Sequence, residues 1–339
     1  MSELAVVRFE PGRREALNRL MDAVWGSHMP DEEFEWWFER NPVGTQLISL
    51  ADDDGKAVGV AAMSFFRFRL DGQEQVVAMP VHVATDPDYR GRGIFPRLEL
   101  ENEAAAGEAG SPITLTFPNA ASHPIFVGRL GWLDLPGRRV WARLLRPGAV
   151  PRYFRGRPSP PGGLNAADPN PRSVGGFRIE PLAEFGPEAD VLWRAAAAGY
   201  GSHLVRDAAY LNWRFAQAPR EYRAFGAFED RRLAGIAIVG YAYRHGVAGG
   251  FLADLIAPSG GRRVTRALLL RCLAEVRGGA DALIALPPPP RAQRRAFLEV
   301  GFLPTWKQVR MIGKVLRPEG RLAPRAADWH FTFGDFDFF

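Results

Sequence analysis

The sequence predicts an α/β (α+β) protein that contains two tandem copies of one unit, and three observations lead to this prediction. The chain has 339 residues, which suits two domains because domains cluster near ~100–150 residues. The Pro/Gly-rich stretch 147–176 resists helix and sheet and is typical of a linker. Short motifs recur in the same order on either side of it. We therefore expect a first domain over 1–147, a linker over 148–176 and a second domain over 177–339.

The recurring motifs are individually short, and their ordered register supports a duplication. Their offsets lie between 169 and 177 residues and drift as small loop insertions would make them drift. The matches are Gly26-Ser27-His28 with Gly201-Ser202-His203, Trp36 with Trp213, Val58-Gly59-Val60 with Ala234-Gly235-Ile236, Phe117-Pro118 with Leu286-Pro287, Gly131-Trp132 with Gly301-Phe302, and Arg146-Pro147 with Arg317-Pro318.

Within the first copy, helical patterns alternate with short apolar runs. The turn signal Asp53-Asp54-Gly55 predicts a hairpin between the two alternating segments that flank it. Pro96 fits the first turn of a helix, where its missing N–H costs nothing. The expected elements are a helix over 13–24, strands over 47–51, 58–68 and 76–85, a helix over 94–106, a strand over 113–117, a short helix over 122–130 and a closing strand over 140–145.

A glycine- and arginine-rich turn, Tyr89-Arg90-Gly91-Arg92-Gly93-Ile94-Phe95, connects the predicted 76–85 strand to the next helix. The start of a helix binds anions because its first N–H groups are unpaired and its dipole is positive there. Small residues let the backbone approach a phosphate, and Arg90 and Arg92 supply counter-charge. The pattern predicts an anion-binding cradle.

This turn resembles the acyl-CoA pyrophosphate loop of the GNAT superfamily of N-acyltransferases, Q/R-x-x-G-x-G/A. Arg90 matches its first position and Gly93 its fourth, whereas Phe95 departs at the sixth. The resemblance implies two tandem GNAT-like domains, each a mixed, mostly antiparallel sheet flanked by helices. The second copy has Ser259-Gly260-Gly261-Arg262-Arg263 at the corresponding place and lacks the spacing, so we expect it to be degenerate. The implied acyl-CoA contacts are Val83, Ala84, Thr85, Arg90, Gly91, Arg92, Gly93, Ile94, Phe95, Asn119 and Phe126.

The resemblance also implies candidates for the chemistry. In the superfamily, a bulged strand before the loop offers a backbone N–H to the thioester carbonyl, and here Val83 or Ala84 corresponds to that donor. Strand alternation places His82 on the face opposite Val83, where it is either the general base or a hydrogen-bonded structural residue.

The segment after the 113–117 strand resembles the family pattern N-x-x-A-x-x-x-Y-x-x-x-G-F. Asn119 matches it and is either a cofactor contact or the cap of the next helix. Phe126 stands where the usual tyrosine acid would be, so His123 or a water would have to protonate the thiolate.

Two aromatic segments each allow a functional and a structural interpretation. Asp31, Glu32, Glu33 and Glu35 alternate with Phe34, Trp36 and Trp37, which fits either a wall for a cationic amine or a solvated acidic helix face over buried rings. The tail 329–339 is too aromatic to remain in solvent and should dock. It either covers a groove or brings the carboxylate of Phe339 to the active site as the base, as in some tandem acetyltransferases.

Composition narrows the function classes. The net charge is +5, but the arginines are dispersed, so no nucleic-acid footprint is visible. No apolar run of ~18 residues predicts a membrane span, and the N-terminus lacks a secretory pattern. The lone Cys272 suits a reducing cytoplasm and a buried helix position. We expect a cytoplasmic monomer or homodimer with no metal ion and no nucleic-acid or membrane partner.

These inferences converge on an acetyltransferase that moves an acetyl group from acetyl-CoA to a primary amine of a small molecule, by direct attack in a ternary complex. Two alternatives stay open. One is an aminoacyl transferase of the FemABX type, which would need a basic groove for its tRNA. The other is a non-catalytic CoA-binding or scaffold module, which the absent tyrosine and the degenerate second copy favour.

Overall fold

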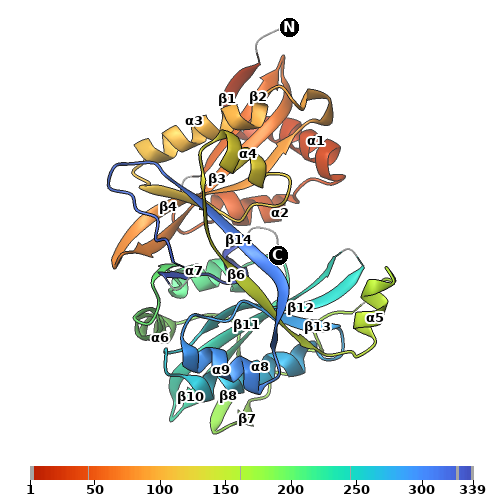
Figure 1. Ribbon diagram of the computed structural model, residues 1–339, viewed down its shortest axis with the longest axis vertical. Helices are drawn as coiled ribbons and strands as arrows, with labels where there is room; N and C mark the ends of the chain where they lie inside the picture. The colour runs from red at the N-terminus through yellow and green to blue at the C-terminus, as the bar shows by residue number, and fades with distance from the viewer. Residues whose placement is uncertain (1–3, 45, 161, 245, 326–327, 337–339) are drawn as a thin grey trace. The chain divides into compact units, whose positions relative to one another are not determined.

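The chain divides into two compact, interrupted units in a computed structural model that describes residues 4–44, 46–160, 162–244, 246–325 and 328–336. Unit 1 comprises Met1–Pro136 and Arg310–Ala326, and unit 2 comprises Gly137–Val309 and Ala327–Phe339 (Figure 1). The expected domains differ from these units, because residues 137–147 belong to unit 2 and residues 310–326 belong to unit 1.

Unit 1 is built on a mixed sheet in the order β1-β2-β3-β4-β5-β14. Its neighbouring strands are antiparallel except β4 and β5, which are parallel. The strands are β1 (Ala5–Arg8), β2 (Leu47–Asp53), β3 (Lys56–Leu70), β4 (Gln73–Thr85), β5 (Ile113–Thr116) and β14 (Leu303–Val315), of which residues 310–315 belong to unit 1. The helices are α1 (Arg14–Trp25), α2 (Asp31–Phe34), the π-helical turn η2 (Glu35–Glu39), the short turn η3 (Pro87–Tyr89), α3 (Ile94–Glu108) and α4 (His123–Arg129).

Most of the elements expected in the first copy are present. The β2–β3 turn has positive φ at Asp54 and Gly55, 49° and 91°, as the Asp-Gly signal predicts. The helices α1, α3 and α4 and the strands β2 to β5 lie where the pattern placed them, within a few residues. Missing from the prediction was the short edge strand β1, too short for periodicity to mark. The acidic and aromatic stretch 31–37, interpreted as helical, lies in α2 and η2.

Unit 2 repeats this arrangement in the order β7-β8-β10-β11-β12-β13-β6. Its strands are β6 (Leu133–Leu144), of which residues 137–144 belong to unit 2, β7 (Arg172–Val174), β8 (Phe177–Leu182), β9 (Ser202–Leu204), β10 (Tyr222–Glu229), β11 (Arg232–Arg244), β12 (Val247–Ile256), β13 (Ala282–Ala285) and β15 (Trp329–His330). Its helices are α5 (Ala149–Phe154), α6 (Pro187–Ala197), α7 (Ala208–Leu211), the π-helical turn η4 (Asn212–Ala216), α8 (Arg262–Val276), α9 (Arg291–Glu299) and the turn η6 (Phe333–Asp335).

The two sequence halves exchange their last strands. β6 follows α4 in the chain but pairs antiparallel with β13, through Trp141 and Ala285 among others. β14 follows α9 but pairs antiparallel with β5, through Ile312 and Thr116. The prediction that residues 140–145 close the first domain was therefore wrong. Either sheet offers an open edge of unpaired backbone groups, and the local pattern of a strand does not say which edge it joins.

The expected linker is not uniformly irregular. It contains the helix α5 and the edge strand β7, which pairs with β8 through Val174 and Phe177. Pro151 lies within the first turns of α5, where a proline is tolerated. The prediction that this stretch resists regular structure holds for residues 155–160 and 162–171, which form no helix or strand.

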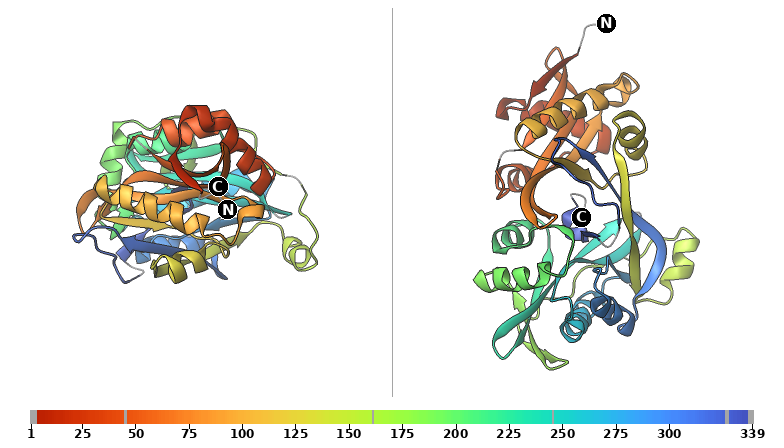
Figure 2. Two further views of the ribbon diagram at one scale, coloured as in Figure 1. Left: turned by 90° about the horizontal axis from the view of Figure 1, so that it is seen from above. Right: turned by 60° about the vertical axis from the view of Figure 1, so that its left-hand side comes forward.

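Helices cover both faces of the unit 1 sheet. Figure 2 shows α1 (red) and α3 (yellow-orange) on opposite sides of its strands, and both helices contact β3 and β4. In unit 2 a large apolar core lies between the sheet and the helices α8 and α9. Cys272 of α8 is buried in this core, which raises the pKa of its thiol to about 12. The expected structural role of Cys272 is confirmed.

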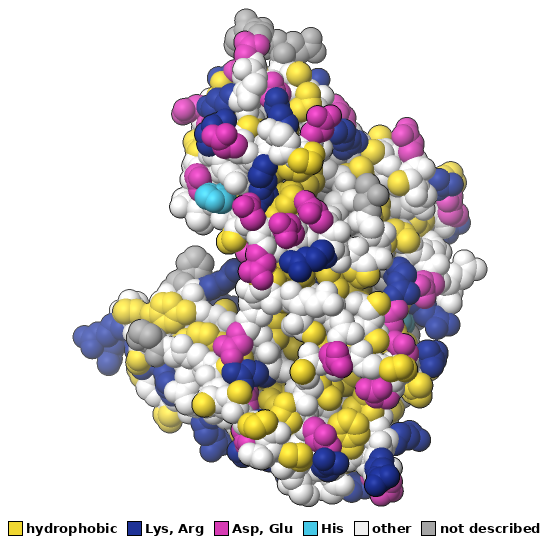
Figure 3. Space-filling model, turned by 180° about the vertical axis from the view of Figure 1, so that it is seen from behind, with side chains coloured by type: hydrophobic (Ala, Val, Ile, Leu, Met, Phe, Trp, Pro, Cys, Tyr) yellow, Lys and Arg dark blue, Asp and Glu magenta, His cyan; other side chains and the backbone are white. Residues whose placement is uncertain are grey.

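Charge is mixed on the surface. On the face shown in Figure 3, basic and acidic side chains are interspersed over the surface rather than collected into one patch. Among the helices of the described chain, none is both long and apolar enough to cross a membrane.

The expected docking of the aromatic tail is confirmed for the described part, up to Phe336. Trp329, Phe331, Phe333 and Phe336 are buried in unit 2. Two buried arginines hold the tail: Arg206 contacts Asp335 at 2.7 Å and Arg214 donates to the carbonyl oxygen of Gly334 at 2.9 Å.

His330 gives the tail a pH dependence that can be measured. Its ring stacks on Tyr200 at 3.9 Å, and burial, with the positive charge of Arg206, holds its pKa well below 6.5. Because the unfolded chain binds this proton more readily, the contribution of His330 to stability is present above about pH 6.5 and is lost as the pH falls.

We expect His330→Phe, which keeps the stacked ring, to lose less stability than the wild type between about pH 6.5 and pH 5, by up to about 1.4 kcal/mol per pH unit. Denaturant unfolding followed over this range measures the difference. Asp335, whose pKa burial raises to about 6, titrates in both proteins with the opposite sign, so it cancels in the comparison. Parallel stability curves for the two proteins would contradict the assignment.

Candidate functional site

The glycine turn that was interpreted from the sequence as an anion cradle leads into the start of α3. The turn η3 leads into Gly91 and Gly93, whose φ angles are 79° and 75°. These left-handed conformations favour glycine, and a Cβ placed at either residue would meet no atom within 4 Å. The loop therefore presents its backbone to open space, where the first amides of α3 lack intrahelical acceptors.

The loop is held from behind by polar contacts. The Asp86 carboxylate accepts from the backbone N–H of Asp88 at 3.0 Å and pairs with Lys56 Nζ at 2.8 Å. The Tyr89 hydroxyl donates to Asp53 Oδ2 at 2.6 Å. The hydrogen bond from Lys56 and the backbone N–H of Asp88 lower the pKa of Asp86, so its negative charge stays available to hold the turn.

Arg90 and Arg92 are both exposed at the rim, as the sequence predicted. Arg92 lies over the Tyr89 ring with its guanidinium carbon 4.6 Å from the ring centre, and its Nη2 donates to the carbonyl oxygen of Asp88 at 3.3 Å. Arg90 Nε donates to the carbonyl oxygen of Thr85 at 3.4 Å. Neither contact neutralises a guanidinium charge, so both charges remain available to an anion.

Gly59 of β3 positions the helix start, a role the sequence did not indicate. A Cβ at Gly59 would collide with Ile94 and touch Leu98 of α3. The absence of a side chain lets the first turn of α3 settle on β3. The sequence did hold one signal for this role, the recurrence of the glycine in the second copy. Gly235 packs in the same way under Val264 and Leu268 of α8.

A cavity of about 180 Å³ adjoins the cradle. Arg92, Gly93 and Ile94 line it at the helix start, and Arg97 follows one turn later on α3. The remaining lining residues come from the β1 edge and β2: Leu4, Val6 and Ala51, together with Leu98 of α3. The cavity thus offers an apolar wall beside two cationic side chains.

The strand before the loop carries a bulge. Val60 of β3 faces Ala84 and Ala62 faces Val81, so the intervening Ala61 faces two residues, His82 and Val83. His82 has φ of 48°, unusual for a residue with a side chain. β4 pairs with β5 at Ala78, and it continues to Thr85 after β5 has ended at Thr116. A bulge leaves part of the local backbone outside the ladder, which is what a carbonyl-binding N–H requires.

His82 and Val83 lie on opposite faces, as alternation predicted. The His82 ring contacts an aromatic group from α1 and η2, with ring centres 6.4 Å from Trp25, 6.2 Å from Trp37 and 5.6 Å from Phe38. Val83 packs with the apolar side chains of α3 and α4. Trp25 is 48% exposed, so this aromatic group reaches the surface.

The aromatic residues of the α2–η2 segment are structural. Phe34, Trp36 and Trp37 are buried, and Trp37 Nε1 donates to Ser64 Oγ at 2.9 Å. Asp31 contacts Arg14 at 3.2 Å. Asp31, Glu32 and Glu35 are exposed, so this pattern matches a solvated acidic face above buried rings.

The Asn119 side chain closes the turn before α4. Its Oδ1 accepts from the backbone N–H groups of Ala121 and Ser122, both at 2.9 Å. The N-cap residue of α4 is Ser122, which makes no side-chain capping bond, so the exposed Asn119 stabilises the preceding turn instead of capping the helix. Phe126 is buried against Phe95 and Trp132, at ring distances of 5.1 and 4.7 Å. Cofactor contact by Phe95 would therefore use its backbone, since its ring belongs to this core.

His123 begins α4, and its Nε2 lies 2.7 Å from Asp134 Oδ1. The side chain is 17% exposed, so a small ligand can reach it. Phe339, the remaining catalytic candidate, lies outside the described residues. Among the residues that are described, no group of three or more His, Cys, Asp or Glu side chains could hold a metal ion.

A buried polar group on α3 was missed by sequence reasoning. Glu103 accepts from Trp132 Nε1 at 2.6 Å and pairs with Lys314 of β14. Glu99, one turn earlier, is fully buried, and burial together with Glu103 raises its pKa well above the usual range. The signal was present: Phe95, Glu99 and Glu103 follow helical spacing on the buried face. The group fastens the exchanged strand to α3.

Comparison with known proteins agrees with this geometry. Residues 8–133 match the family model described as an acetyltransferase (GNAT) domain. No curated protein sequence matches the chain.

Solved structures share its fold at low sequence identity. A GCN5-related N-acetyltransferase from Anabaena variabilis ATCC 29413 aligns with a TM-score of 0.64 and 13% identity, covering 93% of this chain and 73% of that one. One from Kribbella flavida aligns with a TM-score of 0.62 and 17% identity, covering 92% and 71%. N-myristoyltransferase from Saccharomyces cerevisiae, solved with bound myristoyl-CoA, aligns with a TM-score of 0.62 and 10% identity, covering 96% and 84%.

Proposed function

We propose, from the premise that residues 8–133 form a GNAT-type acetyltransferase domain, that the protein is an acyl-CoA-dependent N-acyltransferase. Its donor is acetyl-CoA and its acceptor is a primary amine of a small molecule. One observation carries the proposal: the left-handed Gly91 and Gly93 open the start of α3 directly after the bulged end of β4. An anion cradle and a carbonyl-binding strand are the two parts that a CoA thioester needs.

In the proposed complex, the pyrophosphate lies at the first turn of α3 with Arg90 and Arg92 at its rim. The thioester carbonyl lies at the β4 bulge, where the N–H of Val83 or Ala84 donates to it as negative charge develops. The cavity beside Arg92 and Arg97 accepts part of the nucleotide.

The acyl group moves from sulfur to nitrogen in one direct transfer. The neutral amine attacks the thioester carbonyl, a C–N bond forms and the C–S bond breaks. The amine gives one proton to His82 or to a water that His82 orients, and the departing thiolate takes a proton from His123 or solvent. Holding amine and thioester in register supplies roughly 7–11 kcal/mol of the barrier reduction, so loss of one polar side chain should slow the reaction without abolishing it.

Titration calorimetry with acetyl-CoA, followed by detection of released CoA thiol with a panel of amines, tests the proposal. Binding with turnover supports it. Binding without turnover favours a non-catalytic CoA-binding module, and absence of binding favours an aminoacyl transferase. Myristoyl-CoA in parallel decides whether the donor is acetyl or a long acyl chain.

The role of His82 can be tested separately. We expect His82→Gln to lower kcat by about 100-fold, the lower range for loss of a general base, with little change in acetyl-CoA affinity. The acidic limb of the pH–rate profile should also disappear. His28→Gln is the matched control, because His28 is an exposed histidine that contacts Asp22 at 3.0 Å. An unaltered pH–rate profile in His82→Gln would assign the proton to another group.

A further inference from the structure

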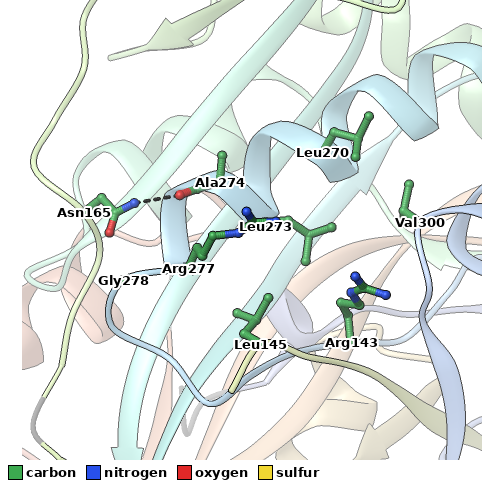
Figure 4. A pocket seen from close by; sticks show the side chains of 9 residues that line it. All are labelled: Arg143, Leu145, Asn165, Leu270, Leu273, Ala274, Arg277, Gly278 and Val300. Atoms are coloured by element: carbon green, nitrogen blue, oxygen red, sulfur yellow. Dashed lines mark hydrogen bonds between the residues drawn. The ribbon is translucent and has the colours of Figure 1, made fainter. Parts of the chain in front are cut away.

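A cavity of about 490 Å³ lies in unit 2, on the surface between α8 and the end of β6 (Figure 4). Its volume falls within the range of small-molecule sites, roughly 300–1,000 Å³. All nine residues that line it belong to unit 2, and none belongs to the cradle or the bulge described above.

One stripe of α8 forms a wall of the cavity. Leu270, Leu273, Ala274 and Arg277 follow the i, i+3, i+4, i+7 spacing of a single helix face. Figure 4 shows this stripe above Leu145, with Val300 at one end. The apolar surface would suit the hydrocarbon part of a ligand.

Two arginines give the cavity its charge. Arg143 of β6 lies near Val300, and Arg277 follows the last turn of α8. Neither guanidinium forms an ion pair with a residue in the described part of the chain. The nearest acid on the helix, Glu275, is buried and pairs with Arg271 at 2.7 Å. The nine lining residues include no carboxylate.

Arg143 is held in place by the backbone. Gly301 has φ of 81°, and a Cβ there would collide with the Arg143 guanidinium. The arginine therefore packs directly on the Gly301 backbone, which only a glycine permits at this position. Its charge is positioned at the cavity instead of extending freely into solvent.

The end of α8 would normally oppose an anion, because the last carbonyls of a helix are negative. Here those carbonyls already have donors. Asn165 Nδ2 donates to Ala274 at 2.6 Å and the Asn165 backbone N–H donates to Glu275 at 2.9 Å. Arg146 donates to Gly278. With the carbonyls capped, the two arginines dominate the local charge.

We propose that this cavity binds a small organic anion with an aliphatic body, a monocarboxylate whose head lies between Arg143 and Arg277 and whose chain lies along Leu273 and Leu145. The apolar wall and the uncompensated cationic charge match the two halves of such a ligand. A purely polar anion would leave the apolar wall wet, and a neutral hydrocarbon would leave both guanidinium groups unpaired.

Octanoate is the probe, and calorimetry with the full chain measures its binding. We expect a Kd of about 1 mM or tighter, with affinity rising from butyrate to octanoate by up to about four-fold per methylene. The double variant Arg143→Gln/Arg277→Gln should weaken octanoate at least about ten-fold, and 1-octanol should bind the wild type at least about ten-fold more weakly than octanoate. Arg266→Gln is the matched control, since Arg266 is exposed on the same helix outside the cavity.

The outcomes separate this site from the proposed active site. Octanoate binding that survives Arg90→Glu/Gly93→Asp and disappears in Arg143→Gln/Arg277→Gln supports the assignment, whatever the activity of unit 1. No binding to the wild type, equal binding to the double variant, or equal affinity for 1-octanol would each overturn it. Single Arg→Gln variants, each expected to lose part of the affinity, give the same test if the double variant does not fold.

Discussion

Changing Arg90 to Glu and Gly93 to Asp in one variant is expected to weaken acetyl-CoA binding by at least about 100-fold. Arg90→Glu reverses a charge at the rim, and Gly93→Asp places a carboxylate at the N-cap of α3, where the pyrophosphate would lie. Charge-assisted hydrogen bonds are the strong ones at such a site. The two new carboxylates would instead repel the pyrophosphate at short range.

The same changes should leave the fold intact. Both residues are exposed, a Cβ at Gly93 meets no atom within 4 Å, and aspartate tolerates the left-handed conformation better than most residues. An N-cap aspartate also stabilises a helix. The variant therefore opposes ligand binding while preserving α3, which far-ultraviolet circular dichroism can verify.

Titration calorimetry with acetyl-CoA measures the effect. Arg266→Glu/Gly110→Asp is the control: it changes net charge equally and places aspartate at another open glycine with positive φ, 96° at Gly110. The control should bind acetyl-CoA as the wild type does. Wild-type affinity in Arg90→Glu/Gly93→Asp would remove the cofactor site from the start of α3.

The second large effect is on stability. Arg206→Leu is expected to destabilise the protein by about 3–5 kcal/mol, the range for breaking a buried ion pair. Arg206 is 0% exposed and contacts two carboxylates, Asp254 at 2.6 Å and Asp335 at 2.7 Å. Its removal leaves two buried negative charges without their counter-ion and frees the tail at Asp335.

Denaturant unfolding measures the loss. Arg19→Leu is the comparison, because the exposed Arg19–Glu15 pair should contribute less than about 1 kcal/mol. Adding Asp254→Asn and Asp335→Asn to Arg206→Leu should recover part of the lost stability. A loss below about 1 kcal/mol in Arg206→Leu would mean that water or another cation already compensates these carboxylates.

Local signals explain what the sequence could predict. The Asp-Gly turn of β2–β3, the period of α3 and the glycines of the cradle all act through neighbouring residues, so each can be recognised in a short window. Gly91 and Gly93 are needed for their own backbone angles, and this requirement is visible in the residue type alone.

Long-range choices explain what it could not predict. Arg206 and Asp335 are far apart in the chain, and the sequence around either residue does not indicate that the other is its partner. Strand alternation placed His82 on the correct face. Its aromatic neighbours come from α1 and η2, and the hydrophobic periodicity of the sequence does not show how these elements pack on the strand. Phe126 matched a family position, yet its packing against Phe95 and Trp132 depends on how α3 and α4 meet.

The exchange of β6 and β14 has a consequence for biosynthesis. On the ribosome, the sheet of unit 1 can form its hairpin β2–β3 and add β4 and β5 early, but its last strand, residues 303–315, emerges only after most of unit 2 has been synthesised. Until then the β5 edge offers unpaired backbone groups to other nascent chains. This edge is thus exposed to misassociation while residues 117–302 are synthesised, and chaperone binding there should last until β14 leaves the exit tunnel.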